Sequence, residues 1–155
     1  KKVWFWDIID QRTRFLLASH MSTSRGAHDA RVVMTKAAQR AQKAPKVVIT
    51  DKLSSYLDGI ELTFGREAKH IAAKGLTASP NTNLIERFHG SLKARTKVMR
   101  GLKKRMTANL VMNGWLVHYN FFRTHEALNN RTPAEKALTR FPYRNWLDVV
   151  TGGRK

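Results

Sequence analysis

Two short apolar runs constrain the fold of this chain most, because each has the pattern of a strand that is covered on both faces. The run at 3–9 is almost wholly apolar and aromatic, and the run at 46–50 is rich in β-branched residues. Between them, from about residue 24 to residue 42, apolar residues recur at helical spacing. This alternation of strand and helix patterns predicts a mixed α/β fold.

The segments beside these runs continue the same order. A polar turn at 10–13 precedes a second strand at 15–18, close enough in sequence to pair antiparallel with the first. After Asp51 we expect a short helix with Tyr56, Leu57, Ile60 and Leu62 on its apolar positions, then a short strand at 69–73. Helices are predicted from about Asn83, from Thr107, and at Thr132–Glu135, where a capping box with Pro at the first helical position is present.

Composition limits the class of protein. With 155 residues and 42% apolar content, the chain can bury one ordinary core, so we expect one domain over 1–150 and a flexible tail at 151–155. The absence of cysteine excludes disulfides and thiolate metal sites and fits a reducing compartment. No apolar stretch approaches the about 18 residues of a membrane span, and no signal peptide is visible. We therefore expect a cytoplasmic protein without a membrane partner.

The charge is strongly positive: 29 Lys and Arg face 11 Asp and Glu, which gives +18 and favours nucleic acid as the partner. An anionic membrane surface is the alternative, but basic amphipathic anchors rarely accompany a full globular core. One run of basic residues contains no acidic residue, so phosphate would relieve its self-repulsion, although such runs are usually only solvated helix faces. The candidate DNA-binding residues in it are Lys93, Arg95, Lys97, Arg100, Lys103, Lys104 and Arg105.

Two acidic residues are placed for metal chemistry. Asp51 ends the apolar run at 46–50, and Glu86 opens the helix that becomes basic. Carboxylates from separate elements can share divalent ions, and Lys93, two helical turns after Glu86, can hold a phosphate beside them. Each residue also has an ordinary explanation: Asp51 as a turn former and Glu86 as a first-turn residue favoured by the helix dipole.

Two histidines and three aromatic residues are predicted to have structural rather than functional roles. His89 and His118 are lone histidines on helices and are predicted to be packing or hydrogen-bonding groups rather than metal ligands. Trp115, Tyr119 and Phe122 recur at helical spacing and are predicted to belong to the core rather than to a base-stacking platform.

Four runs together resemble the catalytic domain of insertion-sequence transposases of the IS6/IS240 type, within the DDE transposase and retroviral-integrase superfamily. The runs are Ile49–Asp51, Asn83–His89 with Lys93, Tyr119–His125 and Thr132–Glu135. The resemblance implies an RNase H-like mixed sheet flanked by helices, with extra C-terminal helices. By it, Asp51 is the second catalytic Asp and Glu86 the catalytic Glu. Together with a first Asp they would bind two Mg²⁺ or Mn²⁺ ions to nick transposon ends and join the 3′-hydroxyl to target DNA. The implied partners are DNA and further copies of the chain.

The first catalytic Asp of that family lies on an opening strand, and three strands precede the first helix. This chain shows only two, and the segment 6–15 resembles the family's second strand and turn. We therefore predict that the chain starts just after the first catalytic strand and that Asp10 is a turn residue. Asp7 is a rival first carboxylate, but residues an odd number apart on a strand face opposite ways, so at most one of the two faces the site. The alternatives are a catalytically inactive DNA-binding remnant and a nuclease acting on RNA–DNA hybrids.

Overall fold

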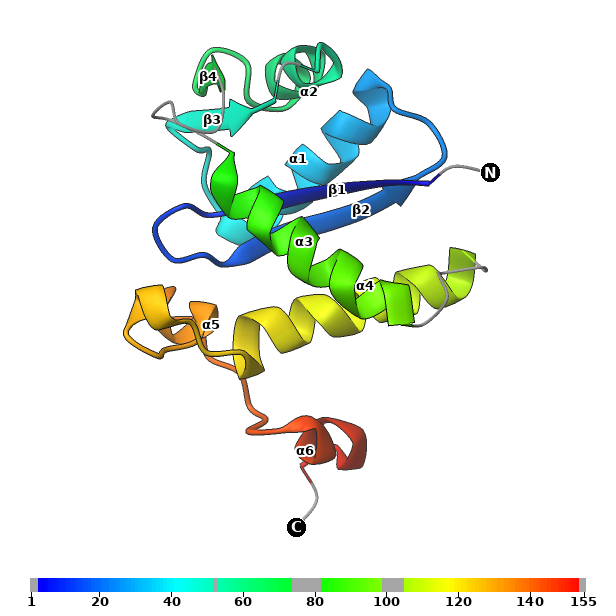
Figure 1. The fold of residues 1–155 in the computed structure, drawn as a ribbon. Helices are drawn as coiled ribbons and strands as arrows, with labels where there is room; N and C mark the ends of the chain where they lie inside the picture. Colours follow the sequence, from blue (N-terminus) through cyan, green and yellow to red (C-terminus); the bar gives the residue numbers. More distant parts are fainter. Residues whose placement is uncertain (1–2, 52, 74–81, 99–104, 154–155) are drawn as a thin grey trace.

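The computed structural model describes residues 3–51, 53–73, 82–98 and 105–153, and it confirms the predicted order of elements (Figure 1). The elements are β1 (Trp4–Ile9), β2 (Leu16–Ser22), α1 (Ala27–Ala41), β3 (Val47–Thr50), α2 (Ser55–Phe64), β4 (Lys69–Ala72), α3 (Asn83–Val98), α4 (Arg105–Val117), a π-helical turn (His118–Phe122), a 3-10 turn (Glu126–Leu128), α5 (Pro133–Lys136) and α6 (Trp146–Thr151). The mixed α/β class is therefore confirmed. No helix in these described ranges is long and apolar enough to cross a membrane.

Strands β1 and β2 form an antiparallel hairpin in which Trp4 pairs with Ser22 and Ile8 pairs with Ala18. The connecting turn is held by Asp10, whose Oδ2 accepts a hydrogen bond from the backbone N–H of Thr13 at 2.8 Å and another from the hydroxyl of the same residue. Such bonds from an aspartate to the residues that follow it stabilise turns. The prediction that Asp10 is a turn residue is thus confirmed.

Helices cover both faces of this hairpin. On one face, Trp6 and Ala18 pack against Val33 and other small residues of α1. On the opposite face, Leu16 packs against Phe88 of α3, together with residues of α4 and the π-helical turn. Figure 1 shows α3 crossing one side of β1 and β2 while α1 lies on the other. Successive residues of β1 therefore meet different layers, as the period of a strand requires.

Strands β3 and β4 pair in parallel, with Val47 opposite Lys69 and Thr50 opposite Ala72, but they form a sheet of their own. Instead of the single mixed sheet that the sequence predicted, the described strands form two two-stranded sheets. Among the described strands, β1 and β3 are consequently paired along one edge only. The prediction that the run 46–50 is buried is wrong at its start, because Val47 is exposed at the open end of the smaller sheet.

Helix α2 rests on α1 through Ile60 and Phe64, which pack with Met34. Leu57 and Leu62, two of the apolar residues expected on this helix, are exposed. Gly59 explains the close approach of the two helices, because a Cβ at this position would lie 2.7 Å from the Cβ of Ala30. The contact therefore uses the face that carries the glycine, and the two leucines are turned to solvent.

The C-terminal segment joins the hairpin through Asn120 in the π-helical turn. Its side chain accepts a hydrogen bond from the Leu16 N–H at 2.8 Å and donates one to the Leu16 carbonyl at 3.0 Å. The predicted capping box is confirmed: Thr132 and Glu135 exchange side-chain to backbone hydrogen bonds, although helix α5 is only four residues long. Helix α6 contains no buried residue.

Candidate functional site

Asp51 lies immediately after β3, and its side chain is 57% exposed. One carboxylate oxygen accepts a hydrogen bond from the Leu53 N–H at 3.1 Å, and the other lies 3.7 Å from the guanidinium of Arg25. That guanidinium also stands over the ring of Trp4, 4.5 Å from its centroid. The Asp51 carboxylate is therefore accessible, and its ion pair with Arg25 is long and solvent-exposed, so that a metal ion can displace it.

Tyr56 lies beside Asp51 on the first turn of α2, with its ring edge-on to Trp6 at a centroid distance of 5.4 Å. Burial raises the pKa of Tyr56 to about 12, and the negative charges of Asp51 and Asp7 act in the same direction, against Arg25. The phenol therefore stays protonated at neutral pH. Tyr56 was predicted only as an apolar position of this helix. The contact between Arg25 and Asp51 was not predicted, because Arg25 lies far earlier in the chain and meets Asp51 only in the folded protein.

Glu86 occupies the first turn of α3 and is exposed. The hydroxyl of Thr82 donates a hydrogen bond of 2.8 Å to Glu86 Oε1, and the Glu86 N–H donates to the Thr82 carbonyl. Helix α3 continues without interruption to Lys93, which is also exposed, so the predicted spacing of two turns along one face is confirmed. Accessible carboxylate and ammonium groups thus follow one another along this helix.

Asp7, the rival first carboxylate, points toward α3 and its side chain is 0% exposed. Its Oδ1 accepts a hydrogen bond from the hydroxyl of Ser19, and its Oδ2 lies 2.8 Å from His89 Nε2. Both oxygens are thus engaged inside the protein. The contact agrees with the prediction that His89 is a hydrogen-bonding group rather than a metal ligand.

The described part of the basic run shows Lys93, Arg95 and Lys97 exposed along α3. The guanidinium of Arg95 lies 5.7 Å from the ring centroid of Trp115. Of the other predicted DNA-binding residues, Arg105 begins α4, and the residues Arg100, Lys103 and Lys104 lie outside the described ranges. The structure therefore shows three accessible cations on the helix that carries Glu86.

A shallow cavity of about 290 Å³ lies between α3, α4 and α6, and Arg95, Trp115, His118 and Trp146 are among its lining residues. Burial lowers the pKa of His118, and the positive charges of Arg95 and Arg123 lower it further. Tyr119 is buried, as predicted for a core residue, whereas Trp115 and Phe122 are only half-buried.

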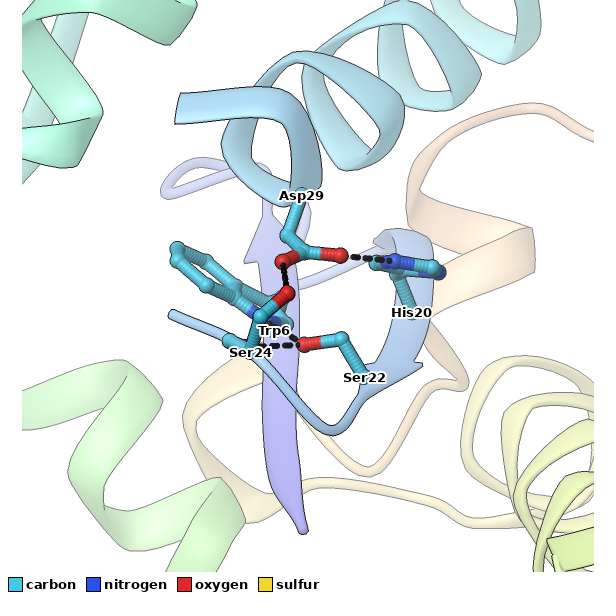
Figure 2. A network of polar contacts seen from close by, with 5 residues as sticks. All are labelled: Trp6, His20, Ser22, Ser24 and Asp29. Carbon is cyan, nitrogen blue, oxygen red and sulfur yellow. Dashed lines mark hydrogen bonds and ion pairs between the residues drawn. The ribbon is translucent and has the colours of Figure 1, made fainter. Parts of the chain in front are cut away.

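Asp29, at the start of α1, is the centre of a polar network (Figure 2). Ser24 donates a hydrogen bond to one carboxylate oxygen, and His20 Nε2 lies 3.1 Å from the other. The network extends through Ser22, whose hydroxyl donates to the Ser24 carbonyl and accepts from the indole of Trp6 at 2.8 Å. Because the serine donates to the carboxylate and not to the histidine, the arrangement braces the loop before α1 and does not activate a nucleophile.

The carboxyl side chain of Asp29 is buried, and burial acts to raise its pKa. The hydrogen bonds from Ser24, His20 and the Gly26 backbone, with the charge of His20, outweigh this and hold the Asp29 pKa below its ordinary value. The carboxylate thus stays ionised inside the protein.

Oxygen donors that suit Mg²⁺ or Mn²⁺ are present in Asp51 and Glu86, and both are accessible. Within the described ranges, however, no three His, Asp or Glu side chains gather closely enough to hold a metal ion. The donor chemistry therefore fits a divalent ion, while the described ligand set is incomplete.

Comparison with known proteins identifies the family of the chain. A family model for the DDE domain of IS240-type transposases matches residues 1–125. The chain therefore belongs to the IS240-type DDE transposase domain family. No curated protein matches it.

Proposed function

We propose that the chain forms part of a metal-dependent DNA phosphoryl-transfer site, which nicks transposon ends and joins the freed 3′-hydroxyl to target DNA. The observation that carries the proposal is the accessibility of Asp51 and Glu86, the two residues that the motif resemblance matches to catalytic carboxylates. The neighbouring Asp7 and Asp10 are used in hydrogen bonds within the protein. Transposon ends, target DNA and further copies of the chain are the proposed partners.

Asp51 and Glu86 would hold the Mg²⁺ or Mn²⁺ ions, of which two are expected in a complete site. Such ions, when bound, stabilise the attacking and leaving oxygens of the phosphodiester. The exposed ammonium of Lys93 would bind a phosphate oxygen two turns further along α3. Arg25 would release Asp51 when a cation arrives, because their 3.7 Å contact is weak.

We place the third carboxylate on a further strand that pairs with the free edges of β1 and β3. Two observations support this: the described strands form two separate sheets, and the described acidic residues form no three-ligand group. An added strand would join the two sheets into the single mixed sheet of an RNase H-like fold. It would also bring its own side chains beside Asp51 at the end of β3.

The test compares this 155-residue chain with the protein translated from the coding sequence that includes the codons upstream of Lys1. Each is incubated with Mn²⁺ and a pre-cut transposon end, and joined products are separated on denaturing gels. We expect the longer protein to join the end to target DNA, and neither its Glu86→Gln variant nor the shorter chain to do so. Joining by the shorter chain would disprove the incomplete site, and activity that survives Glu86→Gln would disprove the role of Glu86.

A second candidate function is DNA binding without catalysis. It is favoured by the exposed cations of α3, which include Lys93, Arg95 and Lys97, together with an incomplete set of metal ligands among the described residues. Under this alternative, both proteins bind duplex DNA with an affinity that falls as salt rises, and neither joins DNA. Affinity that is independent of salt would remove its electrostatic basis.

A further inference from the structure

The contact between Asp7 and His89 joins β1 to α3 across 82 positions of sequence. His89 Nε2 lies 2.8 Å from Asp7 Oδ2, the Asp7 side chain is 0% exposed and the His89 side chain is 32% exposed. A buried carboxylate is costly unless its oxygens are hydrogen-bonded, and among the described residues only Ser19 also donates to this one. The carboxylate therefore fixes His89 where it is.

His89 lies three residues after Glu86 on the same helix. In an α-helix, three residues correspond to about 4.5 Å along the axis and to side chains about 60° apart around it. A contact that fixes the direction of His89 consequently fixes the direction in which Glu86 projects.

Phe88 and Leu92, on either side of His89, pack against Leu16 and its neighbours through apolar contacts. Apolar contacts are non-directional, so they hold the helix close to the sheet but define its rotation poorly. A rotation of about 20° would move a side-chain tip about 6 Å from the helix axis by about 2 Å. Functional side chains must be held to within about 0.5 Å, so the directional hydrogen bond decides the orientation.

Trp6, the residue before Asp7, contacts the helix that follows Asp51. Trp6 lies on the opposite face of β1 and contacts Tyr56, in the helix that follows Asp51, at a centroid distance of 5.4 Å. Two successive residues of β1 thus contact α2, the helix that follows Asp51, and α3, the helix that carries Glu86.

We propose that Asp7 and His89 are positioning residues that set the rotation of α3 and thereby direct Glu86 toward Asp51. The proposal rests on the proposed function of Asp51 and Glu86 as one site. Neither member of the pair is a metal ligand in it, because each is occupied by the other. Loss of the pair leaves the apolar packing of α3 in place but frees the helix to turn.

The chain contains no cysteine, so two introduced thiols can be labelled without background. Ser54→Cys and Arg87→Cys place spin labels at exposed positions beside Asp51 and Glu86. Pulsed electron paramagnetic resonance then measures the distance between the labels. We expect one narrow distribution in this doubly labelled chain and a distribution shifted or broadened by about 2 Å in its His89→Ala variant. His89→Gln, which keeps an N–H donor at a similar reach, restores the narrow distribution.

Asp29→Ala is the matched control, because it destroys the other buried carboxylate network and lowers stability without touching α3. It is expected to leave the distance unchanged. The proposal is overturned if His89→Ala keeps the parent distribution, or if Asp29→Ala broadens it equally. Should circular dichroism show His89→Ala to be unfolded, Ser19→Ala replaces it, with a smaller broadening expected and an unchanged distribution overturning the proposal.

The labelled chain is measured without metal or DNA, so the result is independent of catalysis. The distance distribution can depend on His89 even if the longer protein joins no DNA. That outcome would exclude the proposed function but would still support the positioning role of His89. Normal strand transfer by a longer protein that carries His89→Ala would remove the positioning role and leave the proposed function.

Discussion

Acidic side chains are used in opposite ways in two regions of the molecule. In the β1–β2–α1 region, the carboxylates of Asp7, Asp10 and Asp29 all accept hydrogen bonds from the protein itself. In the β3–α3 region, Asp51 and Glu86 are exposed, each with a single hydrogen-bond donor among the described contacts. The difference separates carboxylates that stabilise the fold from carboxylates that are available to a ligand.

The strongest test of this comparison is the removal of the accessible carboxylates. In the longer protein, Asp51→Asn and Glu86→Gln are each expected to lower the rate of strand transfer by at least about 100-fold, because they remove charge that a metal requires. The melting temperature should stay within a degree or so of the parent, since exposed substitutions rarely affect stability. A large loss of stability in either variant would show that these carboxylates also hold the fold.

Removal of a buried carboxylate should instead lower the stability of the fold. Asp29→Ala is expected to lower the free energy of unfolding by about 2–3 kcal/mol, because Ser24 and His20 lose a charged acceptor. Urea denaturation followed by circular dichroism measures this, with the exposed Asp58→Ala as the control. Since the pKa of Asp29 is lowered in the folded protein, its contribution is fully present above its ordinary value of 3.8 and lost as the pH falls below it. Equal losses of stability in Asp29→Ala and Asp58→Ala would show that the buried carboxylate stabilises the fold no more than an exposed one does.

The next prediction concerns the contribution of the exposed cations of α3 to DNA binding. Lys93→Gln with Lys97→Gln is expected to reduce the slope of log affinity for duplex DNA against log salt by about 2, because about 0.9 counterions are released for each phosphate neutralised. The matched control is Lys36→Gln with Arg40→Gln, two exposed cations on α1. Fluorescence anisotropy at several salt concentrations measures both. An equal loss from the α1 pair would mean that net charge alone binds DNA.

The smallest effect concerns His125. Burial, together with the positive charges of Arg123 and Arg14, lowers the pKa of His125 from its ordinary value of 6.5 to about 4. The unfolded chain therefore binds a proton between these values that the folded chain rejects, so stability falls as the pH drops from 6.5 toward 4.

Because the ring is half-buried, the expected loss between pH 7 and pH 5 is about 1 kcal/mol, or roughly 2–4 °C in Tm. His125→Gln should remove this part of the pH dependence, and the exposed His28→Gln should not. Thermal melts at pH 7 and pH 5 measure this change in Tm for each variant. An unchanged pH dependence in His125→Gln would exclude His125 as its source.

What the sequence predicted well is local. The turn at Asp10, the capping box at Thr132 and the start of α3 at Asn83 each depend on residues within one turn of each other. The accessible Asp51 and Glu86 were also found from the sequence, because each terminates or begins an element.

The contacts that the sequence did not reveal are long-range. His89 meets Asp7 only because α3 crosses the hairpin, and Tyr56 meets Trp6 only because α2 rests on α1. The separation into two sheets depends on which strand edges find partners, which the pattern of a single strand does not encode. Partners that distant are fixed by tertiary packing, so neither spacing nor periodicity indicates them.

Asn120 gives the fold a particular order of assembly. Its side chain supplies both hydrogen-bonding partners for the backbone of Leu16, from 104 positions further along the chain. During synthesis, the start of β2 therefore gains this pair of hydrogen bonds only after the π-helical turn has been made. Contacts of such high sequence separation slow folding, because a long loop must close before they form. The hairpin that organises the candidate site is expected to reach its final state late, together with the C-terminal helices.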